Sequence, residues 1–320
     1  MLYTQNLEEL IFHRHEMHDT DELIVLSGYL GPKPVARIEE LPLNSTVIYG
    51  MYGSEGIRPS LHNSLLNIQN SVDNLNIFYS NLPVHSKCYI WRRRGEIIHS
   101  LIGSANFSVN GLTTPFREVL AETTYDTFQP LNEYLSHILN NSISCLEVGT
   151  ERVNDIVLAE SCSMTMLAKN GEVQTASGLN WGYMKNGQPS PKRGINDACI
   201  PIRVEHIINY PNLFPPKLLS RDFIDLRGRR QRNNEAIEII WDDGITMEGL
   251  LEGSQPVGDI IYPKQISSFP SKSQMGEYIR ERIGVPLGQP VRRHHLERYG
   301  RTDIEISLLG DGVYKFDFSV

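Results

Sequence analysis

The spacing of apolar segments changes half-way along the chain, and this change constrains the fold more than any other feature. In the first half, strand-like segments such as ELIVLSGYLG (22–31) and STVIYGMYG (45–53) alternate with helical patterns such as RPSLHNSLLNIQNS (58–71). Apolar runs bounded by glycine are typical of buried strands, whereas apolar positions three and four apart are typical of helices. Residues 1–150 therefore predict an α/β sheet covered on both faces.

Four more strands are expected in succession, which places antiparallel strands in the middle of this sheet. They are NIFYS (76–80), HSKCYIWRRRG (85–95), EIIHSLIG (96–103) and REVLAETTY (117–125). A turn at Arg94-Gly95 would join the second and third of them into a hairpin. A short helix is expected at 34–41, and an amphipathic helix at 128–142 completes this half.

The second half has short strands separated by long polar loops, which predicts a mostly-β barrel or pseudobarrel. One clear helix is expected at 273–285, and the strands are expected at 199–207, 235–244, 247–253 and 304–320. The less periodic segment 151–178 is interpreted as a connection, with one or two strands, between a domain at 1–150 and another at 179–320. Two domains are ordinary for a chain of 320 residues.

The charge is unevenly distributed between the halves. Residues 1–175 contain 11 Lys and Arg against 20 Asp and Glu, a net charge of −9, whereas residues 176–320 contain 19 against 18, a net charge of +1. The basic residues of the second half are bunched, as in RGRRQR (227–232). Because phosphate contacts depend on local groups, the overall charge of −8 weakens a nucleic-acid function without excluding it.

Targeting and redox signals favour a cytoplasmic protein. The chain has no run of about 18 apolar residues, and its start lacks the apolar stretch of a secretory signal. The four cysteines have no regular spacing, so reduced structural thiols are expected at Cys88, Cys145, Cys162 and Cys199.

A group of residues suited to phosphate chemistry lies around the predicted hairpin. His85 and Lys87 are two apart within a predicted strand, so they should project from the same face. The next strand ends in Gly103-Ser104-Ala105-Asn106, and the hairpin would bring Asn106 beside His85. An imidazole can attack phosphorus, while an ammonium and an amide can hold the phosphate oxygens. These groups suffice for phosphoryl transfer without a metal.

The pairing of HxK, here His85-Ser86-Lys87, with GSxN, here Gly103 to Asn106, resembles the signature of the phospholipase D superfamily. This resemblance implies that one histidine attacks the phosphodiester and forms a phosphohistidine. A second histidine would protonate the leaving alkoxide and then activate water. Because HxK occurs once in this chain, the resemblance implies a homodimer with its site on the twofold axis.

Two positions differ from the commonest form of the motif. Arg92 stands where many members have Asp, and the nuclease members often use an acid from the following strand instead. Glu118 matches that position, so the resemblance implies that it orients His85. The alternatives are a surface hairpin with incidental His and Lys, and a solvent-facing Glu118.

The second half resembles the specificity domain of type II restriction endonucleases of the NgoFVII kind, which is similar to the plant B-three pseudobarrel. The resemblance lies in segments such as LNWGYMKNGQPSPKRGINDACIPI (179–202) and YPKQISSFPSKSQMGEYIRERIG (262–284). It implies two arms, 185–197 and 264–274, that read bases in the major groove of double-stranded DNA.

Within these arms, the side chains suited to base edges are Gln188, Lys192, Arg193, Asn196, Gln265 and Gln274. Residues suited to bases or phosphates are Ser268, Ser271 and Lys272, and phosphate contacts are expected from Arg227, Arg229, Arg230 and Arg232. For each of them the alternative is a solvated loop residue, and for the arginines it is a disordered basic loop.

Other clusters receive simpler interpretations. The group His13, His15, His18 and Asp19 is interpreted as a polar helix face rather than a metal site. Asp242-Asp243-Gly244 is interpreted as a turn between strands, and the segment from Arg292 to His295 as a solvated helix start. Trp181 and Tyr183 are expected to pack against the first arm or the connection, and nothing in the sequence favours their stacking on bases.

Three functions remain open from the sequence. The favoured one is a metal-independent, sequence-specific endodeoxyribonuclease in the cytoplasm of a prokaryote, with no cofactor and with ATP used only through a separate helicase-like subunit. The second is a phospholipase-D-type enzyme acting on lipid head groups, which would be expected to carry two HxK copies or a membrane segment. The third is a DNA-binding protein whose first half only dimerises, although the intact HxK and GSxN argue against it.

Overall fold

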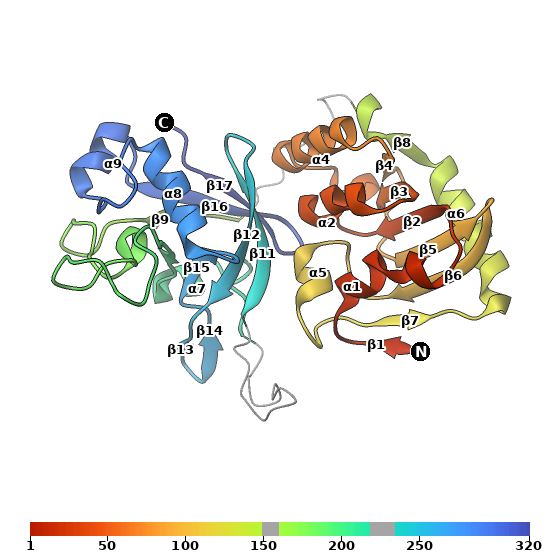
Figure 1. Ribbon diagram of the computed structural model, residues 1–320, viewed down its shortest axis with the longest axis horizontal. Helices are drawn as coiled ribbons and strands as arrows, with labels where there is room; N and C mark the ends of the chain where they lie inside the picture. Colours follow the sequence, from red (N-terminus) through yellow and green to blue (C-terminus); the bar gives the residue numbers. More distant parts are fainter. Residues whose placement is uncertain (149–159, 218–233) are drawn as a thin grey trace. The chain divides into compact units, whose positions relative to one another are not determined.

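The computed structural model describes residues 1–148, 160–217 and 234–320 (Figure 1). The chain forms two compact units. Unit 1 comprises Met1–Leu158 and Leu309–Val313, and unit 2 comprises Ala159–Leu308 and Tyr314–Val320. Unit 1 is a mixed α/β fold and unit 2 is mostly β, which confirms the two predicted fold classes.

Unit 1 is built on an eight-stranded sheet with the strand order β1-β7-β6-β5-β2-β3-β4-β8. Strands β2, β3 and β4 are parallel, and β5, β6 and β7 continue the sheet in antiparallel pairs. The strands are β1 (Leu2–Tyr3), β2 (Glu22–Ser27), β3 (Asn44–Tyr49), β4 (Leu75–Ser80), β5 (Lys87–Arg93), β6 (Glu96–Gly103), β7 (Leu120–Glu122) and β8 (Ser142–Ser144). The sequence did not predict the edge strands β1 and β8, because two or three residues are too few for a recognisable alternation.

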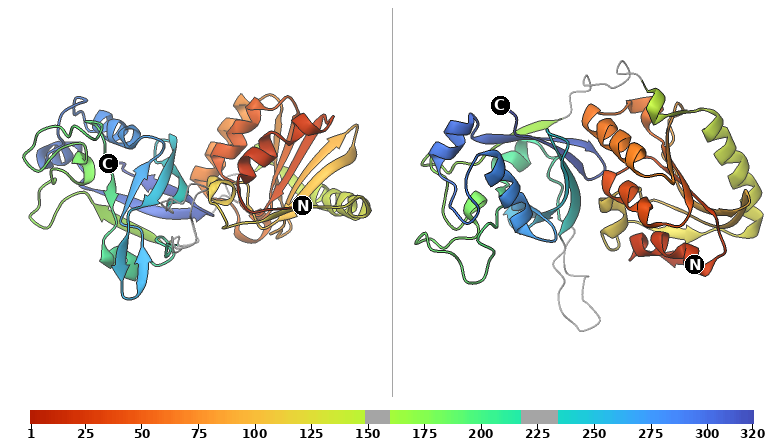
Figure 2. Two further views of the ribbon diagram at one scale, coloured as in Figure 1. Left: turned by 60° about the horizontal axis from the view of Figure 1, so that its bottom comes forward. Right: turned by 45° about the horizontal axis from the view of Figure 1, so that its top comes forward.

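Helices cover both faces of this sheet, as predicted. Helices α2 and α4 lie on one face and α6 on the other (Figure 2). Leu131, Leu135 and Ile138 of α6 belong to the same apolar cluster as Ile24 and Leu26 of β2. The helices of unit 1 are α1 (Leu7–Phe12), α2 (Pro32–Arg37), α3 (Tyr52–Glu55), α4 (Pro59–Ser71), α5 (Val109–Thr113) and α6 (Phe128–Asn140). Because both faces are covered, β2 is an almost continuous apolar run rather than an alternating one.

The predicted turn between β5 and β6 is confirmed at Arg94 and Gly95. Both residues have positive φ, 50° and 84°, as a tight hairpin turn of the right twist requires. Positive φ is unfavourable for a residue with a side chain such as Arg94. The Asp21 carboxylate supports the turn by accepting the Arg94 backbone N–H at 3.0 and 3.1 Å.

Unit 2 contains a nearly barrel-like seven-stranded sheet with the order β10-β15-β12-β11-β17-β16-β9, and a separate pair, β13 with β14. Its described strands are β9 (Ser161–Thr165), β10 (Ile200–Pro201), β11 (Glu235–Trp241), β12 (Thr246–Glu252), β13 (Gln255–Val257), β14 (Ile260–Tyr262), β15 (Gln265–Ser268), β16 (Asp303–Gly310) and β17 (Val313–Asp317). Its described helices are α7 (Val204–Asn209), α8 (Lys272–Arg282) and α9 (Arg293–Tyr299). Strand β9 lies within the predicted connection and pairs with β16.

One predicted strand of unit 2 is wrong. Residues 199–207 form only the two-residue strand β10, and helix α7 begins at Val204. The β-branched residues of this segment favoured a strand in the sequence. Instead, the backbone N–H of Arg203 donates to the imidazole of His206 at 3.2 Å, which caps the first turn of a helix.

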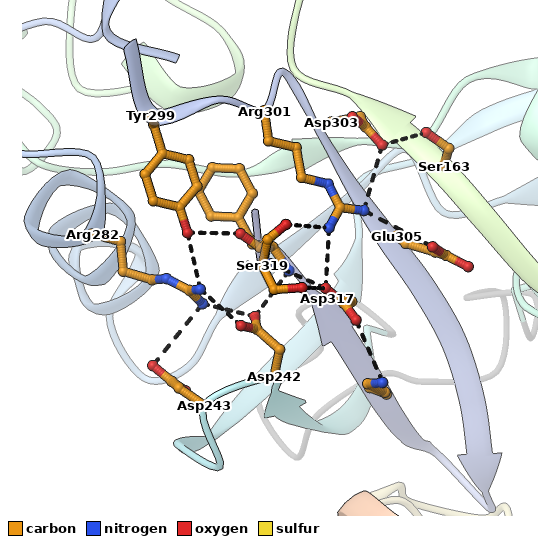
Figure 3. Close-up of polar contacts among 12 residues, drawn as sticks. Ser163, Asp242, Asp243, Arg282, Tyr299, Arg301, Asp303, Glu305, Asp317 and Ser319 are labelled. Carbon is orange, nitrogen blue, oxygen red and sulfur yellow. Dashed lines mark hydrogen bonds and ion pairs between the residues drawn. The ribbon is translucent and has the colours of Figure 1, made fainter. Parts of the chain in front are cut away.

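A polar network holds the end of the chain to the rest of unit 2 (Figure 3). Arg282 of α8 donates to both carboxylate oxygens of Asp242, at 2.7 and 2.8 Å, and to the hydroxyl of Tyr299 at 3.0 Å. Phe318 closes the network, because its N–H donates to Asp242 and its carbonyl accepts from Tyr299. Burial acts to raise the pKa of Asp242, but the hydrogen bonds from Arg282 and Phe318 and the charge of Arg282 bring it below its ordinary value. The predicted turn at residues 242–244 is confirmed between β11 and β12.

The four cysteines are buried and unpaired, as expected for structural thiols. Burial raises the pKa of the Cys88 thiol to about 11, which keeps it protonated and unreactive near neutral pH. Among the helices that the structure describes, none is long and apolar enough to span a bilayer.

Candidate active site

His85 and Lys87 meet at the start of β5. The Lys87 ammonium lies 2.9 Å from Nδ1 and 3.3 Å from Nε2 of His85, and it donates to the His85 carbonyl at 2.6 Å. His85 itself lies two residues before β5 begins, so its predicted position inside a strand is wrong. The physical reason is that the chain at Val84 bonds the carbonyl of Gly50 and joins the ladder with β2 only from Cys88 onward.

Asn106 completes the group from the loop after β6. Its side chain is buried, and its Oδ1 accepts the backbone N–H of Tyr29 at 3.2 Å and the hydroxyl of Ser27 at 3.4 Å. These donors orient the amide so that Nδ2 is the group available to an acceptor. In this structure Nδ2 donates to the carboxylate of Asp311 at 2.9 Å.

Gly28, the residue after β2, is where the three side chains converge. A Cβ atom built on Gly28 would lie 3.2 Å from His85 Cδ2, 3.2 Å from Lys87 Nζ and 3.4 Å from Asn106 Oδ1. The predicted convergence of imidazole, ammonium and carboxamide is therefore present. Gly28 is not among the predicted site residues, although a glycine directly after a buried strand marks a place where other groups approach the backbone closely.

Burial and charge act in opposite directions on Lys87. Burial lowers its pKa, while the carboxylates of Asp311 and Glu118 raise it, and the net pKa is below the ordinary value. Tyr29 packs edge-on against the His85 ring, with 5.9 Å between ring centroids, and its hydroxyl donates to Glu55 at 2.9 Å. Burial and the bond to Glu55 raise the pKa of Tyr29 to about 12, so the ring beside His85 stays neutral.

Glu118 and Ser104 lie near the group but are engaged otherwise. The Glu118 carboxylate is 3.7 Å from Nε of Arg117, and Ser104 Oγ accepts the Val119 N–H at 3.1 Å. In the described part of the chain, Nδ1 of His85 is bonded to Lys87 and not to Glu118, so the orienting role of Glu118 stays a prediction. Arg92, which replaces the commoner Asp, lies along β5 and is 3.6 Å from Glu22.

Three predicted DNA-contacting residues of unit 2 gather around Trp181 and Glu252. The Arg193 guanidinium stacks over the Trp181 ring at 4.1 Å and donates to its carbonyl at 2.8 Å. Lys272 lies 5.5 Å from the same ring and pairs with the Glu252 carboxylate, which also accepts from Gln265 at 2.6 Å. Packing of Trp181 against the first arm is one of the two arrangements that the sequence leaves open, whereas its contact with Lys272, 91 positions away, has no local signal.

The remaining predicted DNA contacts fall into three groups. Two are buried and bonded within unit 2: Asn196 bonds Glu277 and the Gly288 N–H, and Ser268 bonds Ser271 and Met275. Four are exposed, namely Gln188, Lys192, Ser271 and Gln274. The predicted phosphate contacts Arg227, Arg229, Arg230 and Arg232 lie outside the described residues.

The predicted second arm, 264–274, is not one extended segment. It consists of strand β15 and the first turn of α8, joined at Phe269, Pro270 and Ser271. Ser271 caps α8 by accepting the Ser273 N–H at 3.3 Å. Lys272 and Gln274 therefore lie on a rigid helical turn.

The histidines near the start of the chain do not lie on one helix face as predicted. His13 follows the last residue of α1 and lies 2.9 Å from Glu9 and 2.8 Å from Glu16, whereas His18 lies beyond a 3-10 turn at Arg14–Met17 and stacks on His99 with 4.9 Å between ring centroids. In residues 1–148, 160–217 and 234–320, no group of three or more His, Cys, Asp or Glu is placed to hold a metal ion.

Two models of one protein family together match most of the chain. The NgoFVII restriction endonuclease N-terminal PLD domain matches residues 5–152, and the NgoFVII C-terminal B3-like DNA-binding domain matches residues 156–310. The chain belongs to the NgoFVII restriction endonuclease family. The family confirms the predicted order of a phospholipase-D-type nuclease domain followed by a DNA-binding domain.

Solved structures similar to part of the chain include NucT and Nuc. NucT from Helicobacter pylori is 15% identical with a TM-score of 0.34, covering 45% of this chain and 97% of NucT. Nuc from Salmonella typhimurium, a phospholipase D family member, is 14% identical with a TM-score of 0.29, covering 39% of this chain and 82% of Nuc. No curated protein matches the chain.

Proposed function

We propose that this protein is a sequence-specific type II restriction endonuclease that hydrolyses DNA without a metal ion, through a phosphohistidine on His85. The observation that supports this proposal is the convergence of His85, Lys87 and Asn106 beside Gly28, so close that an added methyl group would displace them by a few tenths of an ångström. A nucleophile and two oxygen-binding donors around one point are what phosphoryl transfer requires.

Each of the three side chains has a role in the proposed reaction. The imidazole of His85 forms a P–N bond as the bond from phosphorus to the leaving alkoxide breaks. Lys87 and Asn106 stabilise the negative charge that develops on the non-bridging oxygens. Water then attacks the phosphohistidine, which breaks the P–N bond and releases the 5′- or 3′-phosphate end of the DNA.

The proposed reaction needs a second acid and base, because the leaving alkoxide must gain a proton and the attacking water must lose one. With one HxK in the chain, a second copy of the protein would supply that histidine. We therefore propose a homodimer that brings two His85 side chains to one phosphodiester. Glu118 is proposed to hold the correct tautomer of the ring in that assembly.

Unit 2 is proposed to select the DNA sequence. Arg193 is already ordered by stacking on Trp181 and by its bond to the Trp181 carbonyl, so it loses little freedom on reaching a guanine edge. Lys272 and Gln265 share the Glu252 carboxylate and would exchange that partner for DNA. A helicase-like ATPase could be an additional partner in the cell, but the proposed cleavage does not require it.

The test of cleavage uses plasmid DNA in EDTA. The wild-type protein should cut it, and His85→Ala should not, while the exposed His137→Ala serves as the matched control and should cut normally. A reaction on labelled DNA should also be stopped by adding base. The label should then be found on the protein and should be released by acid, because the P–N bond of a phosphohistidine is stable in base and is hydrolysed in acid. Cleavage that needs magnesium, or that survives in His85→Ala, would show a different nuclease chemistry.

The test of recognition uses the full-length His85→Ala variant, which binds without cutting. Selection from random oligonucleotides should enrich one short motif, and Arg193→Ala should relax the choice at one position of it by about 1–3 kcal/mol. Enrichment of no motif would contradict the assignment of sequence recognition to this chain.

A further inference from the structure

The carboxylate of Asp311 contacts the candidate active site at Asn106. Asp311 belongs to the segment Leu309–Val313, which is part of unit 1 although it joins β16 to β17. Its Oδ2 accepts from Asn106 Nδ2 at 2.9 Å and from the Ser108 hydroxyl at 3.4 Å. Its Oδ1 lies 3.8 Å from a guanidinium nitrogen of Arg117, and the side chain is only 18% exposed.

Gly312 lets this segment approach the site closely. A Cβ on Gly312 would lie 2.5 Å from Asn110 Cβ in α5, and Gly312 has a φ of +69°. An ordinary hairpin turn needs glycine for its backbone angles, but not for contact with another element. Here the glycine after Asp311 also allows the segment to lie against the Asn110 side chain, where any larger residue would overlap it. On the other side of Asp311, Gly310 lies beside the Tyr29 ring at an ordinary contact distance.

The bond from Asn106 to Asp311 uses the hydrogen-bond donor that the proposed reaction needs. Asn106 Oδ1 is held by Tyr29 and Ser27, so Nδ2 is the atom left to bind a phosphate oxygen. The negative charge of Asp311 also acts on Lys87. A carboxylate and a phosphodiester both present anionic oxygens to such donors. Nδ2 has two hydrogens, but two anions held side by side on it would repel each other, so the two groups compete for this position.

We propose that Asp311 is an internal competitor for the substrate phosphate. This inference rests on the proposed function, in which Asn106 binds the scissile phosphate. It adds Ser108 and Arg117 to the groups that receive this phosphate. In the free protein the Asp311 carboxylate accepts from Asn106 and Ser108 and lies beside the charged Arg117. This carboxylate moves away when a DNA phosphate binds. The competitor limits hydrolysis to DNA that is bound well enough to displace it.

The experiment compares Asp311→Asn and Asp311→Ala with wild type and with the exposed control Asp73→Asn, all as full-length protein. Inorganic phosphate is the first probe, and its affinity is measured by calorimetry. A competitor bound for nine-tenths of the time weakens the apparent affinity about tenfold, so both Asp311 variants should bind phosphate about tenfold more tightly. The additional change Asn106→Ala should remove this gain, and Asp73→Asn should behave as wild type.

Plasmid hydrolysis in EDTA is the second measurement, and thermal melting establishes that each variant is folded. The Asp311 variants should cut DNA without a preferred site about tenfold faster than wild type. Phosphate affinity within twofold of wild type in both folded variants would overturn the proposal. A loss of cleavage without tighter phosphate binding would also overturn it, since Asp311 would then be a positioning residue. If no variant cuts DNA but phosphate binds more tightly, the competitor stands and the proposed function fails.

Discussion

Arg280 of α8 is buried and bonded only to main-chain acceptors among its described contacts, which makes its replacement a sharp test of how unit 2 is held together. It is 1% exposed and donates to the carbonyls of Gln289 at 3.0 Å, Asn196 at 3.1 Å, Gly276 at 2.9 Å and Leu179 at 3.0 Å. Burial lowers its pKa, which is the cost of placing a cation there.

The perturbation is Arg280→Met, which keeps the apolar stem and removes all donors. Three of the four carbonyls belong to segments other than α8, and two of these, in the buried residues Asn196 and Leu179, would lose their hydrogen bond from Arg280 without access to water. Hydrogen bonds to charged groups contribute about 1.5–3 kcal/mol each, and the recovered desolvation of the guanidinium offsets part of the sum. We expect the free energy of unfolding of unit 2 to fall by about 4 kcal/mol, or about 10 °C in its melting temperature.

The measurement is urea unfolding of the full chain together with calorimetry, and Arg298→Met is the matched control. Arg298 also donates to two carbonyls, but at 3.4 and 3.5 Å and in an exposed position, so its loss should be below about 1 kcal/mol. Because Arg280 bonds the Asn196 carbonyl at the end of the predicted first arm, DNA affinity should fall as well. A loss of less than about 1 kcal/mol in Arg280→Met would refute the reasoning.

Two further predictions concern unit 1. Gly28→Ala adds a methyl group 3.2 Å from both His85 and Lys87, so these side chains must shift by a few tenths of an ångström. DNA hydrolysis in EDTA should slow about tenfold, while the melting temperature should stay near that of the wild type. An unchanged rate would contradict the close packing at Gly28. Burial lowers the pKa of His99 in the folded protein to about 4, below the ordinary value of about 6.5 in the unfolded chain. As the pH falls from 6.5 to 4, the unfolded chain therefore binds a proton before the folded protein does, and the free energy of unfolding falls by up to about 3 kcal/mol. Urea unfolding at pH 7.5 and pH 5 should show this loss, His99→Gln should reduce it, and an equal pH dependence in both proteins would contradict it.

Local patterns were enough to predict most of unit 1. The apolar runs at β2 and β3 and the helical spacing of α4 each lie within one element, and β6 has the predicted bounds. The predicted contact within the HxK motif is also present in the structure. Residues two apart in an extended chain project from the same face, even where the chain is not yet paired in a sheet. His85 shows this, since it lies outside β5 and still contacts Lys87.

Long-range placement could not be predicted from these patterns. Asp311 is 205 positions from Asn106, and no local signal links the two. The three side chains at Gly28 come from two other segments, at residues 85–87 and at Asn106, and no local signal shows that these meet there. Helix α7 formed against the preference of its β-branched residues, because the bond between Arg203 and His206 decides the first turn. In each case tertiary contacts decide what the local sequence leaves open.

The nuclease unit is not continuous in the gene, since its last five residues follow some 150 positions of the other unit. During synthesis the ribosome delivers His85, Lys87 and Asn106 long before it delivers Asp311. If the proposed function holds, a newly made chain would thus pass through a stage in which His85, Lys87 and Asn106 are assembled and Asp311 is not yet present. A cleavage module excised at residue 158 for fusion to another reader would remain permanently at that stage.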